Sequence, residues 1–406
     1  MPNKDRNIPK RRFKEFENAD AWELRKLGEV MEVTSVKRIH QSDWTDFGVR
    51  FLRARDIVAE SKNESVSEPL FISQKKYDEY TAISGKVTKG DLLVTGVGTI
   101  GIPMLIEKNE PIYFKDGNII WFKNENHIDG QFFYYSFIGK KIQSFIKESA
   151  GIGTVGTFTI NTGKNTPIDL PVLKKEQEAI GTFFSTLDRH ITLHQRKLDK
   201  LKCVKQAYLS EMFPAEGERV PKRRFPGFTD AWELRKLGEV VYRSNLTSSS
   251  KDLPRLEFED INSGLGTLNK DISQKVDDRK GLEFNEGDVL FGKLRPYLKN
   301  WWYAEFKGIA LGDFWNLKSD LWHSCFLYTY IQSNSFQLVA NDTSGTKMPR
   351  SDWNLVAESI AKFPSFPEQT AIGTFFSTLD RHITLHQRKL EKLKNLKKAL
   401  LNELFV

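Results

Sequence analysis

Two glycine-rich stretches of the chain have the spacing of a nucleotide-binding loop. GVGTIG at 96–101 and GIGTVG at 151–156 both match G-x-G-x-x-G. That fingerprint binds a dinucleotide only where a strand precedes it, a helix follows it and an acidic residue lies about 20 positions further on. The first stretch is followed by Ile102-Pro103-Met104, which cannot open an ordinary helix, and the second follows a helix-like stretch. We therefore expect turns of surface loops at both places.

Two histidine pairs have the i, i+4 spacing that can ligate zinc on one face of a helix. His190 and His194 form the first pair, and His382 and His386 form the second. Neither pair has a cysteine or acidic residue spaced to complete a site, so we expect no metal. His194 and His386 also fall on an apolar helix seam, where a polar residue fixes the register of packed helices. A role for them as a pH sensor stays open.

Basic residues interleaved with aromatic residues suggest a nucleic-acid surface in the second half of the chain. The segment GKLRPYLKNWW at 292–302 contains a proline-stiffened turn. Arginine suits guanine edges and phosphates, whereas lysine suits phosphates alone. An ordinary solvated loop is the alternative. The candidates in this half are Lys293, Arg295, Tyr297, Lys299, Lys347 and Arg350. Those in the first half are more scattered: Arg53, Arg55, Lys86, Lys89, Thr95, Thr99 and Lys115.

The chain lacks the motifs of the common catalytic sites. It contains no G-x-S-x-G, no H-E-x-x-H and no phosphate loop, and it lacks the Asn- or Asp-Pro-Pro-aromatic tetrad of an adenine methyltransferase. We therefore expect a protein that is not an enzyme.

Composition sets the class of protein. The 406 residues allow two to four domains, and 39% hydrophobic residues indicate a globular chain. No apolar run approaches the length of a membrane span, and the first residues lack the apolar stretch of a secretion signal. Cys203 and Cys325 lie far apart, so we expect a reducing cytoplasm and no disulfide. A net charge of +8 favours a polyanionic partner.

Two segments of the chain occur twice. AIGTFFSTLDRHITLHQRKL stands at 179–198 and again, unchanged, at 371–390. AWELRKLGEV stands at 21–30 and at 231–240, whereas the sequence between these copies is not repeated. Two near-identical frames therefore carry two different inserts, which is the design of a protein that reads a two-part target.

The longer repeat predicts a helix with a heptad seam, because its apolar positions alternate between spacings of four and three. A helix from 176 to 212 would span roughly 55 Å at about 1.5 Å per residue. We expect the two copies to pack antiparallel and bury each other's stripe, with pseudo-two-fold symmetry and the inserts at opposite ends. The seam residues are Phe184, Leu187, Ile191, His194, Leu198 and Leu201, and Phe376, Leu379, Ile383, His386, Leu390 and Leu393.

The two inserts predict mixed α/β units. Strand-like runs at 91–95 and 118–122 precede a helical stretch at 130–146 in the first insert, and the second has a strand at 288–291 and a helical stretch near 319–337. A Gly-Asp pair precedes the central strand in both, so we expect distant versions of one fold. The expected class is α+β. The expected domains are an N-terminal segment (1–20), a first insert domain (21–172), a first spacer helix and linker (173–222), a second insert domain (223–364) and a second spacer helix (365–406).

The chain resembles the specificity subunits of type I restriction-modification systems over essentially its whole length. The resemblance is carried by WELRKLGEV at 22–30 and 232–240, by the Gly-Asp strands at 90–95 and 287–292, by FGKLRPYLKN at 291–300, and by EQEAIGTFFSTLD at 176–188 with EQTAIGTFFSTLD at 368–380. It implies a DNA-recognition protein whose two target-recognition domains each read half of a bipartite site. It also implies assembly with two modification subunits, which carry S-adenosylmethionine and methylate adenine, and with ATP-dependent restriction subunits. This chain would hold no cofactor of its own.

Recognition of this kind fits the physics of the duplex. Two domains at a fixed separation enter the same face of DNA only about one helical turn apart, roughly 10 bp. Affinity would come mainly from phosphate contacts, and specificity from base edges. A stand-alone sequence-specific or architectural DNA-binding protein is the alternative, and it would bind its site without any partner.

Overall fold

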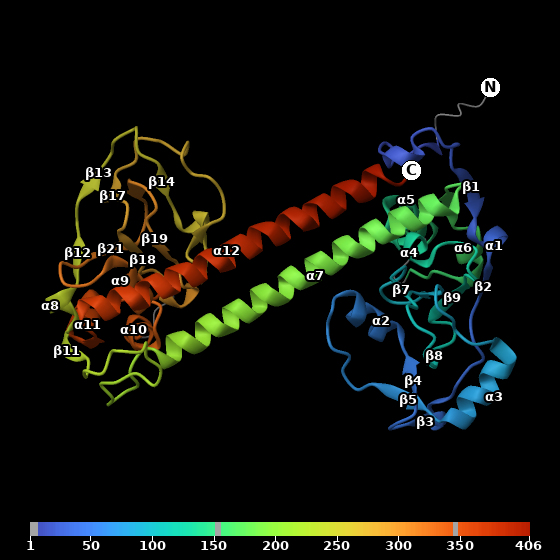
Figure 1. Ribbon diagram of the computed structural model, residues 1–406, viewed down its shortest axis with the longest axis horizontal. Helices are drawn as coiled ribbons and strands as arrows, with labels where there is room; N and C mark the ends of the chain where they lie inside the picture. The colour runs from blue at the N-terminus through green and yellow to red at the C-terminus, as the bar shows by residue number, and fades with distance from the viewer. Residues whose placement is uncertain (1–6, 151–155, 344–347) are drawn as a thin grey trace. The chain divides into compact units, whose positions relative to one another are not determined.

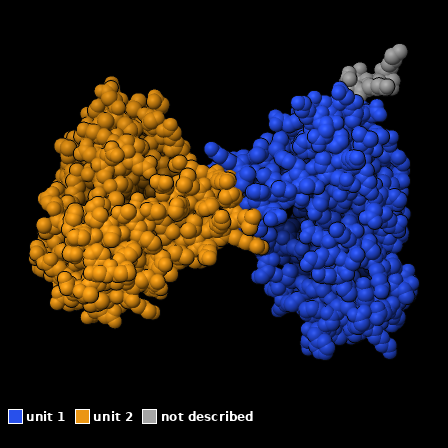
Figure 2. Space-filling model, viewed as in Figure 1, with its two compact units in different colours: residues 1–192, 391–406 blue, residues 193–390 orange. Residues whose placement is uncertain are grey.

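The computed structural model describes residues 7–150, 156–343 and 348–406. The chain divides into two compact units, which Figure 2 shows in two colours. Unit 1 comprises residues 1–192 and 391–406, and unit 2 comprises residues 193–390. Each unit therefore contains one insert and a part of each of the two long helices.

The long helices are α7 (Lys174–Glu211) and α12 (Phe366–Glu403), with 38 residues each (Figure 1). Pro171 lies just before α7, and Pro367 lies in the first turn of α12, where a missing N–H costs nothing. Each helix has one interior glycine at an equivalent place. A Cβ on Gly181 would lie 2.7 Å from the backbone nitrogen of Phe132, and one on Gly373 would lie 2.8 Å from that of Phe326. These glycines let each long helix approach the insert of its unit closely.

The helices pack antiparallel within each unit. In unit 1, Lys397 of α12 lies 2.7 Å from Asp188 of α7, and the rings of Phe405 and Phe184 are 5.9 Å apart. In unit 2, the rings of Tyr208 and Phe375 are 5.1 Å apart. In these contacts, residues later in α7 meet residues earlier in α12, so the helices run in opposite directions.

The seam residues lie on the packed faces of the helices. Phe184, Leu187, Leu198, Phe376, Leu379, Ile383 and Leu390 are buried. Ile191, His194, Leu201, His386 and Leu393 are half-buried. The heptad spacing of the apolar residues therefore predicted which face of each long helix is buried.

Unit 1 contains three sheets. A two-stranded ribbon pairs β1 with β10, a four-stranded sheet has the order β2-β9-β6-β7, and a second has the order β3-β5-β4-β8. The strands are β1 (Glu23–Lys26), β2 (Glu32–Thr34), β3 (Trp44–Thr45), β4 (Val49–Leu52), β5 (Leu70–Ile72), β6 (Leu92–Thr95), β7 (Pro103–Leu105), β8 (Ile112–Phe114), β9 (Ile119–Lys123) and β10 (Pro167–Leu170). The short helices are η2 (Lys14–Phe16), α1 (Leu27–Val30), η3 (Gln41–Asp43), α2 (Ala54–Ser61), α3 (Gln74–Ser84), α4 (Gly130–Ile138), α5 (Lys140–Ser149) and α6 (Ile160–Asn165).

Unit 2 has the matching ribbon β11-β22, a sheet of order β12-β21-β18-β19, a sheet of order β13-β17-β20-β14 and the hairpin β15-β16. The strands are β11 (Glu233–Lys236), β12 (Tyr242–Ser244), β13 (Thr247–Ser248), β14 (Arg255–Leu256), β15 (Ile261–Asn262), β16 (Thr267–Leu268), β17 (Gly281–Phe284), β18 (Val289–Gly292), β19 (Trp301–Tyr303), β20 (Gly308–Ala310), β21 (Phe314–Lys318) and β22 (Ile360–Phe363). The short helices are α8 (Leu237–Val240), η4 (Phe258–Asp260), η5 (Pro296–Leu298), α9 (Ser324–Tyr330), α10 (Asn334–Ala340) and α11 (Trp353–Glu358).

The two inserts share one sheet and differ in the other. The sheets β2-β9-β6-β7 and β12-β21-β18-β19 have the same order and are antiparallel throughout. In the second sheets, β4 pairs parallel with β8 as β14 does with β20. However, β5 adds to the edge of β4, whereas β17 adds to the edge of β20. The inserts are therefore two versions of one fold that diverge away from the repeated frame.

The Gly-Asp pair has the same structural role in both inserts. Gly90 and Gly287 have φ of +98° and +84°, a conformation that favours glycine. The Asp91 carboxylate accepts hydrogen bonds from Trp121 Nε1 and the Asn124 backbone, both at 2.9 Å. The Asp288 carboxylate accepts one from Asn316 Nδ2 at 2.8 Å. Each aspartate thus ties the turn before the central strand to its neighbouring strand.

The predicted α+β class, with two mixed α/β inserts and a pair of long antiparallel helices, is confirmed. The predicted helical stretch at 130–146 is two helices, α4 and α5, because Gly139 in an extended conformation interrupts it. Within the described ranges, no helix is both long and apolar enough to cross a membrane.

Candidate nucleic-acid interface

The loop between β18 and β19 of unit 2 displays three of the predicted residues on its outer side. Arg295 and Lys299 flank the single turn of η5, and Tyr297 lies at its centre. All three side chains are exposed, with Tyr297 at 56%. In the part of the chain that the structure describes, none of them makes a hydrogen bond or ion pair through its side chain. They are available to a partner from outside.

This loop is held in an uncommon conformation. Arg295 and Lys299 have φ of +49° and +59°, in the left-handed region where side chains other than glycine cost about 1–3 kcal/mol. Two backbone hydrogen bonds hold them there: Arg295 donates to the Pro349 carbonyl at 2.7 Å, and the Lys299 carbonyl accepts from Gly264 at 2.9 Å. The tip of the loop is therefore fixed by two neighbouring loops.

Lys293 and Arg350 lie together at the side of this loop. Both pair with Asp313, with N–O distances of 3.5 Å for Lys293 and 3.0 Å for Arg350. The shared carboxylate neutralises part of their charge and orients both cations. We define the basic loop surface as Arg295, Tyr297 and Lys299. The remaining predicted residue of this half, Lys347, lies outside the described residues.

The equivalent loop of unit 1, between β6 and β7, is a glycine turn. Gly98 and Gly101 both have φ of +75°, and no helix follows residues 96–101. Thr95 is fully buried, and its hydroxyl donates to the Thr99 carbonyl at 2.6 Å and accepts from the Ile102 backbone at 3.0 Å. Thr95 therefore stabilises the turn and cannot contact DNA, which corrects its prediction as a site residue. Thr99 is exposed.

The other candidates of unit 1 are not gathered into one surface loop. Arg53 lies just before α2 and pairs with the buried Asp56 at 3.2 Å, and Arg55 pairs with Glu68 at 3.5 Å. Lys86 lies 5.7 Å from the ring centre of Tyr77. Lys89 and Lys115 follow α3 and β8, respectively, on separate turns. The contacts of Arg53 within its own fold indicate a structural role for that residue.

The structure adds residues that sequence reasoning missed. Leu298 and Met348 are 43% and 49% exposed beside the basic loop surface. In unit 1, Phe47 is 82% exposed at the turn between β3 and β4. The sequence does not reveal whether an apolar residue in a turn is exposed. The composition of Asp46-Phe47-Gly48 does, however, indicate a turn at this place.

The two histidines of each pair lie in different environments. His190 and His382 are exposed, whereas the Nδ1 atoms of His194 and His386 lie 3.0 Å apart on the seam. Within 7–150, 156–343 and 348–406, no group of three His, Cys, Asp or Glu residues could hold a metal ion.

Known proteins share this sequence pattern. Residues 19–203 match the family described as type I restriction modification DNA specificity domain. A type I restriction enzyme specificity subunit of Escherichia coli, EcoDI, is 23% identical over 250 residues, which are 58% of this chain and 53% of that protein. Part of this chain is therefore similar to type I restriction-modification specificity proteins.

A second curated protein and a solved structure are also similar to this chain. A putative specificity subunit of Haemophilus influenzae is 30% identical over 125 residues, covering 30% of this chain and 31% of that protein. The chain thus matches about half, or less, of the length of these curated relatives. A crystal structure of a type I system S subunit from M. genitalium has a TM-score of 0.64 at 16% identity, covering 98% of this chain and 99% of the other. That likeness concerns the fold.

Proposed function

We propose that this chain is the DNA sequence-recognition subunit of a type I restriction-modification complex. Each insert would read one short block of a bipartite target, and the bases between the blocks would go unread. The observation that carries the proposal is the duplication: two nearly identical frames hold two inserts of one fold with different loops. A protein that reads one symmetric site needs no such difference.

The loops supply a chemistry for base reading. The basic loop surface offers two exposed, unpaired cations beside an exposed tyrosine on a rigid turn. Arg295 suits a guanine edge or a phosphate, Lys299 suits a phosphate, and Tyr297 can pack against sugars or bases. In unit 1, the corresponding β6–β7 loop brings Thr99 and small residues, so its contacts would be of a different kind. Lys86, Lys89 and Lys115 would add phosphate contacts there.

The repeated frames would bind the two modification subunits. Identical partners require identical surfaces, and the frames leave the same leucines exposed. Leu24 and Leu234 of the ribbons are 54% and 42% exposed, and Leu193 and Leu385 of the long helices are 45% and 52% exposed. The exposure of the same leucines in both copies is explained if a partner protein covers them.

Catalysis would belong to the partners. The modification subunits would bind S-adenosylmethionine and flip the target adenine out of the stack, and the restriction subunits would use ATP. This chain would be non-catalytic and would contain no cofactor. The proposal includes a cytoplasmic location, where the DNA and the partner subunits would be met.

Co-expression with the modification subunit tests the proposal. We expect affinity purification of this chain to recover two modification subunits per copy, and adenine-methylation mapping to yield one bipartite sequence. Leu24→Glu should remove one modification subunit, Leu234→Glu the other, and the double variant both. Leu396→Glu changes an equally exposed leucine of α12 outside the duplicated segments, and should leave the stoichiometry unchanged. Tight binding of this chain alone to one specific site, with no co-purifying methyltransferase, would instead support a stand-alone DNA-binding protein.

A further inference from the structure

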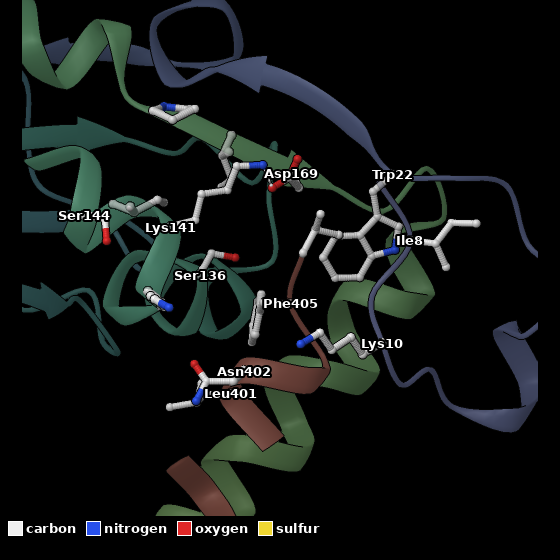
Figure 3. Close-up of a pocket in the computed structure, with 16 residues that line it drawn as sticks. Ile8, Lys10, Trp22, Ser136, Lys141, Ser144, Asp169, Leu401, Asn402 and Phe405 are labelled. Atoms are coloured by element: carbon white, nitrogen blue, oxygen red, sulfur yellow. Dashed lines mark hydrogen bonds and ion pairs between the residues drawn. The ribbon is translucent and has the colours of Figure 1, made fainter. Parts of the chain in front are cut away.

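Unit 1 contains a cavity of about 600 Å³ beneath the β1-β10 ribbon. Its wall comes from the N-terminal segment, from α4 and α5, from β10, and from the last turn of α12 and the residues after it (Figure 3). All of these segments belong to unit 1. Trp22 and Phe405 give it an aromatic wall, and Ser136 and Asp169 give it a polar one.

The internal repeat identifies the equivalent place in unit 2. The backbone nitrogens of Asp129 and His323, which precede α4 and α9, donate to the side-chain oxygens of Gln177 and Gln369 at 3.1 and 2.9 Å. These glutamines occupy the same position in the two frames. The helices α4 and α9 therefore correspond residue by residue from this point.

Aromatic contacts confirm the correspondence. Phe132 and Phe326, each three positions further on, pack against the tryptophans of the ribbons, Trp22 at 5.7 Å and Trp232 at 6.1 Å. The same two phenylalanines also pack against an aromatic residue that follows a long helix. These contacts are Phe132–Phe405 at 5.4 Å and Phe326–Phe213 at 5.9 Å.

Seven positions after Asp129 and His323 the two units differ. Unit 1 has Ser136 where unit 2 has Tyr330. The ring of Tyr330 lies 6.2 Å from that of Phe213 and 5.9 Å from that of Phe336, and the residue is only 3% exposed. The counterparts of Phe213 and Phe336 are Phe405 and Ile142, and both of them line the cavity of unit 1. The cavity therefore lies where unit 2 buries a phenol ring of its own chain.

Two polar atoms at this cavity need a hydrogen-bond partner. Ser136 and Asp169 are 7% and 6% exposed, and within the described ranges neither Ser136 Oγ nor Asp169 Oδ1 has one. The other oxygen of Asp169 pairs with Lys141. Figure 3 shows the Ser136 hydroxyl directed into the space between Phe405 and Asp169. A buried acceptor without a donor is unfavourable, so a ligand that brings a hydroxyl group would be stabilised here.

We propose that this cavity binds a phenol group, a flat apolar ring that carries one hydroxyl donor. The ring would occupy the space that Tyr330 fills in unit 2, and the hydroxyl would bond Asp169 or Ser136. The volume is in the ordinary range of ligand pockets. The group would come either from a small free phenol or from a tyrosine of a modification subunit. The second source rests on the function proposed above, whereas the cavity itself does not.

Binding of p-cresol, the tyrosine side chain as a free molecule, tests the proposal on the full-length chain. We expect one saturable site by ligand-observed NMR, with toluene binding at least several-fold more weakly because it lacks the hydroxyl. Ser136→Tyr should weaken p-cresol binding at least tenfold, because the new ring fills the cavity. Ile142→Phe narrows the cavity from another side and should act in the same direction if Ser136→Tyr does not fold. Ser136→Ala keeps the space and should reduce the preference for p-cresol over toluene.

Each result decides a separate point. Absence of saturable p-cresol binding to the wild type, or equal binding to the wild type and both filled variants, would overturn the proposal. If the filled variants also lose one modification subunit on co-purification, the phenol comes from that partner. If they lose p-cresol but assemble normally, the ligand is a free molecule. Both outcomes support the cavity, and neither depends on whether the chain reads a bipartite site.

Discussion

At the scale of single residues, the basic loop surface combines a left-handed backbone with side chains that have no partner in the described part of the chain. Arg295 and Lys299 are in a left-handed conformation, and both side chains project from the loop without a partner among the described residues. A backbone strained by its neighbours persists because the surrounding hydrogen bonds stabilise it. In this loop, the cations of Arg295 and Lys299 pair with no carboxylate of the described residues. Lys293 and Arg350, in contrast, both pair with Asp313.

Arg295→Ala tests base reading by this loop. If Arg295 contacts a base edge, binding of the complex to its target should weaken by about 1–3 kcal/mol and one position of the methylated sequence should relax. A uniform loss on all sequences would mark a phosphate contact instead. Electrophoretic mobility shifts and methylome sequencing measure the two effects. Lys200→Ala removes an exposed cation of α7 outside the duplicated segments and should change neither.

A second group of charged residues forms a network of ion pairs beside η4 of unit 2. The carboxyl of Asp260 is fully buried, and Lys275 Nζ lies 2.7 Å from it and 2.6 Å from Glu257. Although burial by itself would raise the pKa of Asp260, hydrogen bonds from Lys270 and Lys275 lower it below its ordinary value. Hydrogen bonds from Lys275 and Arg279 lower the pKa of Glu257. These interactions stabilise the fold only while the carboxyls are ionised.

Lys275→Met should therefore destabilise unit 2 in a pH-dependent way. Near neutral pH we expect a loss of about 1–3 kcal/mol, because two carboxylates lose a charged donor. A lowered folded pKa contributes stability above the unfolded pKa and loses it as pH falls through the folded value. The difference from wild type should thus shrink as pH falls below the ordinary carboxyl range. Urea unfolding at several pH values measures it, and a difference that does not change with pH would contradict this account.

At the scale of elements, the long helices pair polar residues inside an apolar seam. Lys205 of α7 lies 2.6 Å from Asp380 of α12 in unit 2, and Lys397 of α12 lies 2.7 Å from Asp188 of α7 in unit 1. The two pairs are the same pair in the two copies of the repeat. A polar residue at a core position of packed helices costs stability and specifies register, because only one alignment gives it a partner.

Lys205→Ala should reveal this coupling. Burial raises the pKa of Asp380, and the Lys205 ammonium opposes the shift. Without Lys205, we expect a loss of about 1.5–3 kcal/mol where Asp380 is ionised. The pKa of Asp380 would rise further, so the deficit should diminish as pH falls through that raised value. Lys200→Ala, on the exposed face of the same helix, is the control. Asp380→Ala in the Lys205→Ala background should add little, and full additivity would argue against coupling.

At the scale of the whole molecule, recognition is modular if each insert reads its own block. The frame is built from repeated residues, and the sheets that diverge, β3-β5-β4-β8 and β13-β17-β20-β14, contain no repeated segment. An insert can then change while the contacts of its frame remain. Trp22 and Arg12 contact Glu176 in unit 1, and Arg224 contacts Glu368 in unit 2, independently of the loops.

Exchange of residues 31–172 for the first insert of a type I specificity subunit should alter one half of the methylated sequence and leave the other half unchanged. This exchange leaves the repeated segment at 231–240 and the β18–β19 loop unchanged, so the second block should persist. Methylome sequencing of cells that express the chimera with its modification subunit measures both halves. A change in both blocks would contradict modular recognition. Insertion of one heptad in both α7 and α12 should instead change only the unread gap.

The sequence by itself determined the repeat, the period of the long helices and the strand that follows each Gly-Asp pair. These features follow from short-range rules: a stripe repeats every three to four residues along a helix, and a glycine adopts a positive φ wherever a turn needs it. It also selected Arg295, Tyr297 and Lys299 correctly as exposed residues, because a proline turn with charged neighbours lies at the surface.

Only the tertiary structure decided what depends on residues far apart in the chain. It buries Thr95, pairs both Lys293 and Arg350 with Asp313, attaches β5 and β17 to different strands, and opens a cavity at Ser136 where unit 2 buries Tyr330. The physical reason is that burial and pairing are properties of a packed neighbourhood. A serine and a tyrosine fit the same helical pattern equally well, and only the packing around α4 and α9 determines that one leaves space and the other fills it.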